Sequence, residues 1–174
     1  VDERFNQVDE RFNQVDQRFD QMDQTMQSMN NRIGTLIGES MELRYRNHIG
    51  AFFGRVLKRT RVVEIGSLQD TLPRETFLKL LQLDLLARGR VEDHPDQPEV
   101  WLAMEISAII NTNDVIRVRQ RADILLQAGY PTIAIAAGEE CSRDAAELAW
   151  QTNVVIMQDG GEMTGWDTAL ANVL

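Results

Sequence analysis

The sequence predicts an α/β domain with a mixed central sheet flanked by helices, preceded by a long coiled-coil helix. Three observations lead to this fold class. Apolar residues follow a heptad spacing at the start of the chain, two strand-like segments are joined by a polar connection, and helical and strand-like segments then alternate. We therefore expect a coiled-coil oligomerisation helix over residues 1–37 and an α/β domain over residues 38–174.

The first segment repeats the heptad Val-Asp-Glu-Arg-Phe-Asn-Gln twice and continues in less regular copies, with no Gly or Pro before Gly34. A 3.5-residue period keeps one apolar stripe facing a partner helix. An isolated helix this polar has only marginal stability in water, so association must stabilise it. We expect a homo-oligomer, with a dimer favoured over a trimer, and a coil that continues a longer one. The alternative is a helix folded back on its own domain. Position a holds Phe5, Phe12, Phe19, Met26 and Ile33, and position d holds Val1, Val8, Val15, Met22, Met29 and Leu36.

The elements of the domain follow from changes in apolar spacing and from Pro and Gly punctuation. A helix with a broad apolar face is expected from Leu36 to about Lys58, and the strands on either side of Glu92–Glu99 are expected to be antiparallel neighbours. Asn111 to Asp114 is expected to cap a helix. The expected strands are Arg61–Gly66, Leu83–Val91, Val100–Ile110, Thr132–Ala137 and Asn153–Met157, the last closed by Asp159-Gly160-Gly161. The expected later helices are Asp70–Gln82, Val115–Ala128, Ser142–Gln151 and Gly165–Leu174.

Composition restricts the possible partners and the cellular compartment of the chain. The formal net charge of −9 argues against a strongly non-specific nucleic-acid binder. Two local basic clusters indicate either solvated helix faces or a groove for an anionic partner. The single cysteine, Cys141, favours a reducing compartment, and no segment reaches the roughly 20 apolar residues of a membrane span, so we expect a cytoplasmic protein with no membrane partner. The clusters are Arg44, Arg46, Arg55, Lys58, Arg59 and Arg61, and then Arg117, Arg119 and Arg121.

Two acids lie inside apolar strand segments. Alternation places Glu105 and Ser107 on one face of their strand, and Asp84 lies between leucines on the preceding strand. An unpaired buried carboxylate is unfavourable, so a shared divalent cation would explain both acids. The alternative is that each carboxylate is paired with an arginine such as Arg88 or Arg121.

The order helix, strand, hairpin carrying Asp and then Glu, helix, strand resembles the restriction-endonuclease-like superfamily with its PD-(D/E)XK motif. The resemblance covers roughly residues 38–160 and extends to bacterial domains of unknown function that join a coiled coil to this core. It implies that Asp84 and Glu105 bind Mg²⁺ or Mn²⁺, that Glu42 or Glu39 supplies the helical acid, and that DNA or RNA is the partner.

The motif departs from the family at two positions. Leu83 stands in place of the proline, and Ser107 stands in place of the lysine. The second change removes the positive charge that would stabilise the negative charge developing on the phosphate in the transition state. In this family the basic residue sometimes moves to the next helix, where Arg121 is the candidate, with Arg117, Arg119 and Gln120 as further choices. The predicted catalytic residues are therefore Glu105, Ser107, Glu42 and Arg121.

Two functions remain open. The first is a metal-dependent phosphodiesterase, an endonuclease, and the second is a catalytically inactive, nuclease-derived interaction and oligomerisation module. The sequence contains no phosphate-binding loop or dinucleotide fingerprint, and His48 and His94 share no metal-ligand spacing.

Overall fold

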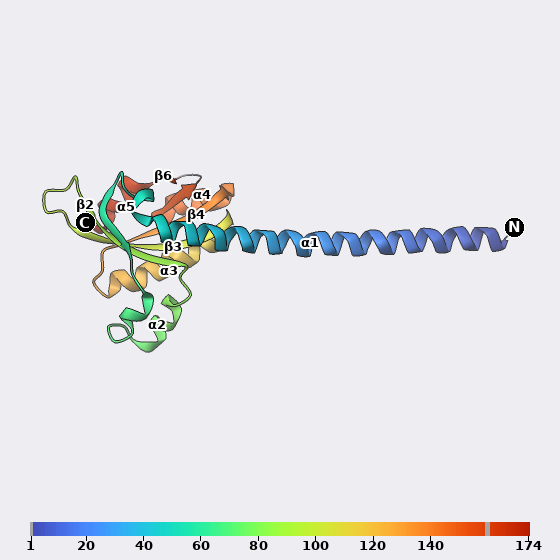
Figure 1. The fold of residues 1–174 in the computed structure, drawn as a ribbon, viewed down its shortest axis with the longest axis horizontal. Coiled ribbons are helices and arrows are strands. Elements are labelled where there is room, and N and C mark those ends of the chain that lie inside the picture. Colours follow the sequence, from blue (N-terminus) through green and yellow to red (C-terminus); the bar gives the residue numbers. More distant parts are fainter. Residues whose placement is uncertain (1, 159–160) are drawn as a thin grey trace. The chain divides into compact units, whose positions relative to one another are not determined.

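The computed structural model describes residues 2–158 and 161–174. The chain divides into two compact units, and the division falls between Leu36 and Ile37. Helix α1 (Asp2–Phe52) supplies the described part of the first unit and the first element of the second (Figure 1). Its backbone leaves helical geometry at His48, where φ is −127° and ψ is 26°.

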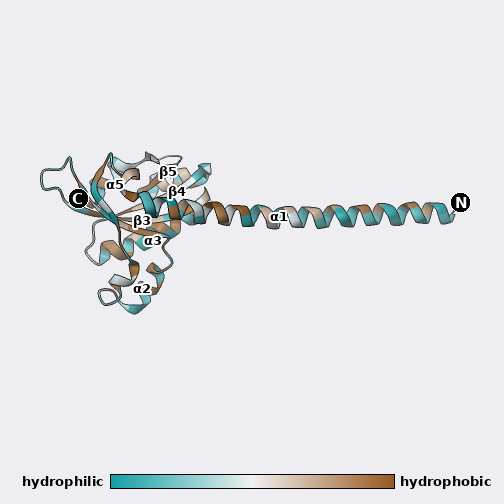
Figure 2. Ribbon diagram, viewed as in Figure 1, coloured by the Kyte–Doolittle hydropathy of each residue, from teal (hydrophilic) through white to brown (hydrophobic). Residues whose placement is uncertain are grey.

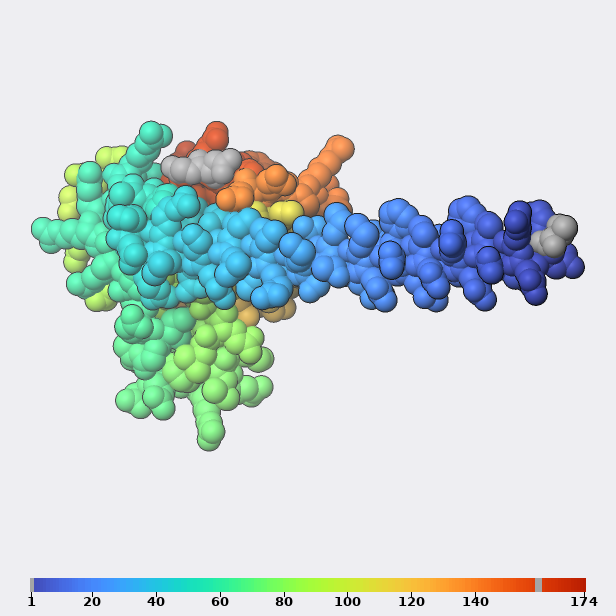
Figure 3. Space-filling model, turned by 45° about the vertical axis from the view of Figure 1, so that its right-hand side comes forward, coloured from blue at the N-terminus to red at the C-terminus, as the bar shows by residue number. Residues whose placement is uncertain are grey.

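The first unit exposes its apolar stripe. The side chains of Phe5 and Phe12 are 67% and 65% exposed, and the stripe continues through Phe19 and the following Met residues to Leu36. Figure 2 shows hydrophobic positions recurring along this part of α1 between hydrophilic ones, and in the view of Figure 3 its side chains are uncovered. The predicted helix is therefore present, with an apolar face that has no partner in the single chain.

The second unit contains a mixed six-stranded sheet whose spatial order follows the chain, so the predicted α/β class with a mixed sheet is confirmed. The first three strands form an antiparallel meander, the third to fifth are parallel, and the sixth is antiparallel to the fifth. The strands are β1 (Leu57–Val62), β2 (Leu85–Val91), β3 (Glu99–Ile110), β4 (Thr132–Cys141), β5 (Val154–Gln158) and β6 (Glu162–Thr164).

Helices cover both faces of the sheet and create two hydrophobic clusters (Figure 1). Met104 belongs to the cluster under the last turns of α1 and under α5, whereas its neighbour Ala103 belongs to the cluster under α2, α3 and α4. The unit is therefore a three-layer sandwich, and β3 contributes to both layers of core. The helices are α2 (Arg74–Leu80), α3 (Thr112–Gln127), α4 (Arg143–Thr152) and α5 (Trp166–Val173), with a 3₁₀ helix at Ile65–Leu68.

The predicted boundary between the first domain helix and the first strand is wrong. The helix ends at Phe52 instead of near Lys58, and β1 begins at Leu57 instead of Arg61. Leu57 is buried and pairs with Val91, so pairing with β2 overrides the helical spacing of the apolar residues. The ladder shifts register between Lys58 and Arg61, and Arg59 adopts a φ of 55° there.

The capping signal at the start of α3 predicted its position correctly. Asn111 and Asp114 form the predicted cap as a reciprocal capping box, with backbone-to-side-chain bonds of 2.9 and 3.1 Å. Strand β4 extends beyond the predicted Ala137 because Gly138 continues the pairing with β3. Strand β6 was not predicted, since three residues carry little pattern, and Asp159 and Gly160 of the predicted closing turn lie outside the described residues.

Candidate functional site

Asp84 and Glu105 are brought together by the pairing of β2 with β3. Asp84 lies immediately before β2 rather than within a strand, which corrects the predicted boundary. Leu85 is paired with Met104, and continuing this antiparallel register places Asp84 opposite Glu105 on the same side of the sheet. The Oδ2 atom of Asp84 accepts a hydrogen bond of 2.7 Å from the backbone N–H of Ile106.

Glu105 is held by two arginines of α3. Its side chain is only 5% exposed and forms an ion pair with Arg121 through Oε1. Its second oxygen lies 3.7 Å from Nε of Arg117. Arg121 is itself buried and donates a further hydrogen bond of 3.2 Å to Oε1 of Gln82. Both carboxylate oxygens of Glu105 therefore face guanidinium groups, as expected for a buried charge that must be compensated.

The network continues to the start of α3. Asp114 is 2% exposed, caps the helix through Asn111, and forms an ion pair with Arg117. Arg117 is an exposed member, with a side-chain exposure of 46%. The capping box of α3 and the pairing of Glu105 therefore share one arginine.

Of the two candidate helical acids, Glu42 has a charge that acts on Asp84. Glu42 lies 3.3 Å from Arg46, one helical turn further along α1. Arg46 in turn donates a hydrogen bond of 3.2 Å to the backbone carbonyl of Asp84. Glu39 is exposed. The charge of Glu42 therefore reaches Asp84, and Asp84 lies opposite Glu105 in the continued register of β2 and β3.

The electrostatics of the site follow from burial. Desolvation raises the pKa of Asp84, and the negative charge of Glu42 adds to this, while the Ile106 N–H and the two arginines of α3 lower it. Desolvation also lowers the pKa of Arg121, and the charge of Asp84 counteracts that shift. Burial is the dominant cause in both residues.

Ser107 lies two positions beyond Glu105 and is half-buried. It pairs with Gly138 of β4, and a Cβ at Gly138 would come within 2.6 Å of the Ser107 carbonyl oxygen. Strands β3 and β4 therefore approach closely beside the predicted lysine position. The hydroxyl of Ser107 cannot replace the positive charge of a lysine, and the two arginines that are near are engaged by Glu105.

As arranged, these side chains do not fit a divalent cation. Within residues 2–158 and 161–174, no group of three or more His, Cys, Asp or Glu side chains is placed to hold a metal ion. Carboxylate oxygens are the ligands that Mg²⁺ and Mn²⁺ use, but those of Glu105 face Arg117 and Arg121, and Asp84 is bonded to a backbone amide.

The other predicted arginines have partners elsewhere. Arg119 forms an ion pair of 2.9 Å with Asp123, and Arg88 pairs with Glu99 at 3.3 Å. The basic cluster of α3 is therefore largely neutralised by acids of the same domain. Of the two arginines suggested as partners for the buried acids, Arg121 has that role and Arg88 does not.

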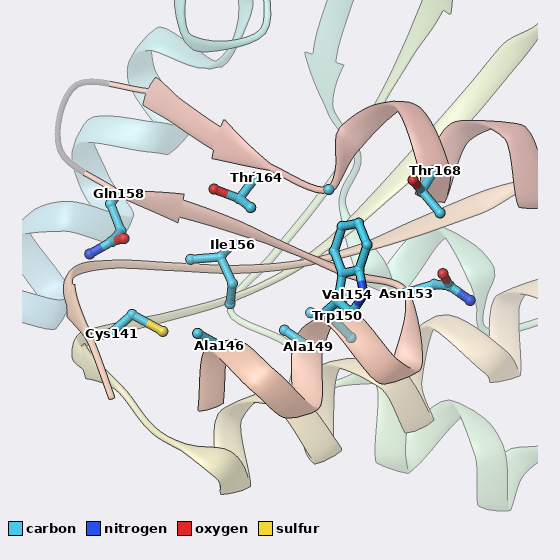
Figure 4. A pocket seen from close by; sticks show the side chains of 11 residues that line it. Cys141, Ala146, Ala149, Trp150, Asn153, Val154, Ile156, Gln158, Thr164 and Thr168 are labelled. Carbon is cyan, nitrogen blue, oxygen red and sulfur yellow. The ribbon is translucent and has the colours of Figure 1, made fainter. Parts of the chain in front are cut away.

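A separate small pocket of about 90 Å³ lies between α4 and the last strands (Figure 4). Trp150 and Ile156 contribute apolar surface, and Cys141 presents its sulfur at one side. Burial raises the pKa of the Cys141 thiol, which disfavours the reactive thiolate. Among the described residues, none that lines the pocket carries a charged side chain.

No helix in the described part of the chain, including the long α1, has a stretch apolar enough to cross a lipid bilayer.

Sequence reasoning did not find two members of the ion-paired network, Gln82 and Asp114. Gln82 follows α2 and precedes Leu83, and the only signal was a polar residue at the end of a predicted helix. Asp114 was assigned only as part of a cap, although a capping acid three residues before an arginine can also form an ion pair. Comparisons of the chain with family models, curated proteins and solved structures gave no match.

Proposed function

We propose that this chain is a nuclease-derived interaction module that does not cleave nucleic acid and that assembles into a homo-oligomer through its coiled coil. The observation that carries the proposal is the ion pair between Glu105 and Arg121. The order of α1, the β1–β2–β3 meander, α3 and the parallel strand β4 supports a restriction-endonuclease-like fold.

The ion pair competes with metal binding at the same oxygens. A cation at Glu105 would have to displace Arg121, and this would leave a guanidinium that is 8% exposed without its partner. Breaking one side of a buried pair typically costs about 3–5 kcal/mol. The remaining positive charge would also repel the incoming ion. Glu105 is therefore better suited to hold α3 on the sheet than to bind a cation.

Ser107 supports the same reading, because it provides no cation for a phosphate in the transition state. Replacement by Arg117 or Arg121 would require these side chains to leave Glu105. Arginine is also a poor activator of water, since its pKa remains far above neutrality.

The first unit supports assembly. Its apolar stripe recurs at heptad spacing and is exposed in the single chain, as for Phe12 at 65% and Leu36 at 63%. Burial of such a stripe is the main source of stability in coiled coils. We propose that copies of this chain cover it.

A metal-dependent phosphodiesterase acting on DNA or RNA is the second candidate. It is favoured by the position of Asp84 opposite Glu105, and by the field of Glu42 at Asp84. When bound, Mg²⁺ or Mn²⁺ would supply a Lewis acid for the scissile phosphate. Arg117, whose side chain is 46% exposed, would then be the residue able to contact a phosphate.

Titration of Mn²⁺ into the purified chain separates the two candidates. The wild type, Asp84→Asn and the exposed-acid control Asp70→Asn are compared by calorimetry and in DNA and RNA cleavage assays with Mn²⁺. We expect no stoichiometric binding and no cleavage by any of the three. Stoichiometric binding together with cleavage, both lost only in Asp84→Asn, would show that the chain is a nuclease.

We also propose a reducing compartment, the cytoplasm, for this chain. The support is its single cysteine, which cannot form an intramolecular disulfide and whose pKa is raised by burial. Fractionation of cells that express the tagged protein tests this, and recovery from an oxidising compartment would contradict it.

A further inference from the structure

The residues that flank the apolar stripe carry opposite charges on its two sides. With Phe5 at position a, the e positions of the first heptads are all aspartate and the g positions are all arginine. These residues lie in α1 and are exposed, and none of these arginines forms an ion pair within residues 2–36. The e positions are Asp2, Asp9, Asp16 and Asp23, and the g positions are Arg4, Arg11 and Arg18.

We propose that the coil is parallel and in register, with a second copy of this chain as the occupant of the exposed stripe. The inference rests on the assembly proposed above and adds the orientation of the chains. Residues at e and g border the core of a coiled coil, and their charges select partner and orientation.

In a parallel pair, a g residue faces the e residue of the other helix five positions later in the sequence. Arg4 then faces Asp9 of the second copy, Arg11 faces Asp16, and Arg18 faces Asp23. Each of these contacts joins opposite charges, and symmetry repeats each of them on the other side of the stripe. Every charged e and g residue from Arg4 to Asp23 thus faces an opposite charge in the second copy.

An antiparallel pair that keeps the apolar residues facing one another gives the opposite result. Layers such as Val8 against Ile33 bring g beside g and e beside e. Arg11 then lies near Arg32 of the second copy, and Asp16 lies near Asp23. These like-charge contacts penalise the antiparallel arrangement without changing its apolar core.

The parallel orientation has a consequence for the rest of the chain. Leu36 of each copy lies at the same end of the coil, so the second units of all copies begin from neighbouring points. The second units are then presented together, so a partner that binds one of them meets the others at a raised effective concentration.

Disulfide trapping tests the orientation. In a Cys141→Ser background, Val8→Cys and Ile33→Cys chains with tags of different size are mixed, refolded together and oxidised. We expect disulfides between two Val8→Cys chains and between two Ile33→Cys chains, seen on a non-reducing gel. A mixed disulfide between position 8 and position 33 would overturn the proposal.

The mass of the untreated chain in light scattering distinguishes the two failures. A mass of one chain, 19.8 kDa, would refute the assembly proposed above. An oligomer that forms the mixed disulfide would refute only the parallel orientation.

Charge reversal tests whether the flanking charges set the orientation, because it changes the association affinity in opposite directions in the two orientations. In the parallel coil Arg11→Asp faces Asp16, and we expect weaker association by roughly tenfold at low salt. Adding Asp16→Arg to the same chain should restore the affinity. In the antiparallel coil Arg11→Asp would face Arg32, so tighter association would overturn the proposal. Asn13→Asp with Gln14→Asp makes the same change in net charge at outward positions and serves as the control.

Discussion

The Oδ2 atom of Asp84 accepts a hydrogen bond of 2.7 Å from the backbone N–H of Ile106. This bond joins the residue before β2 to the strand that carries Glu105. The half-buried carboxylate is therefore part of the connection between two strands, and the register places it opposite the buried Glu105.

The first prediction concerns the pH dependence of stability. The folded-state pKa of Asp84 lies above its ordinary value of 3.8, chiefly through burial, so the folded chain binds its proton more tightly than the unfolded chain. The contribution of Asp84 to stability therefore falls as the pH rises from 3.8 through the raised pKa. Asp84→Asn keeps an oxygen acceptor for the Ile106 N–H and removes the charge.

We expect Asp84→Asn to gain stability relative to the wild type as the pH rises through this window, and then to reach a plateau. Urea unfolding of both chains over a pH series measures the difference. Asp70→Asn, at an exposed acid, should show no such trend. A difference that shrinks with rising pH would contradict the assignment.

The second prediction concerns the buried ion pair. Arg121→Ala should lower the free energy of unfolding by about 3–5 kcal/mol, because it leaves Glu105 charged and buried without its main partner. Removing both charges in Glu105→Leu with Arg121→Met should recover most of this loss, since neither group then needs compensation. Denaturant unfolding of Glu105→Leu, Arg121→Met and the double variant gives the coupling energy.

Arg119→Ala is the matched control on the same helix. Arg119 pairs with Asp123, whose side chain is 49% exposed, and exposed pairs contribute only about 0.2–1 kcal/mol. Equal losses in Arg119→Ala and Arg121→Ala would argue that Glu105 does not depend on Arg121.

The third prediction concerns the close approach of β3 and β4. A Cβ at Gly138 would lie 2.6 Å from the Ser107 carbonyl oxygen and 2.7 Å from Cγ1 of Ile110. Gly138→Ala should therefore destabilise the chain by roughly 1–3 kcal/mol, the range for overpacking. Thermal unfolding followed by circular dichroism measures the effect. Gly66→Ala is the control, because nothing lies within 4 Å of its added Cβ, and a comparable loss there would contradict the steric cause.

The fourth prediction concerns the apolar stripe of the first unit. Phe12→Ser with Phe19→Ser should reduce the mass in light scattering to that of one chain and lower the helical signal, because a polar helix alone is marginal in water. Gln14→Ser with Gln21→Ser changes two outward positions of the same heptads and should keep the oligomer. Loss of assembly in both variants would point to helix propensity rather than to the stripe.

Patterns that repeat over many residues predicted most of the fold. The heptads indicated a helix through the first unit, alternation along β3 placed Ala103 and Met104 on opposite faces, and the Asn111 cap was found from its residue types. Each of these signals depends on neighbours within a few positions of the chain. Elements whose limits depend on distant pairing were not located in this way, as the start of β1 at Leu57 shows.

The sequence by itself predicted that the segments carrying Asp84 and Glu105 are neighbours, although Asp84 precedes β2, and that a stripe of apolar residues needs a partner. Only the tertiary structure decided what surrounds the two acids. Arg121 is 16 residues from Glu105 in the sequence, and Gln82 is 39 residues from Arg121. Their meeting depends on how α3 packs on the sheet, and no local spacing encodes that packing. Glu105 needs Arg121 only in the folded chain, because only burial makes an unpaired carboxylate unfavourable.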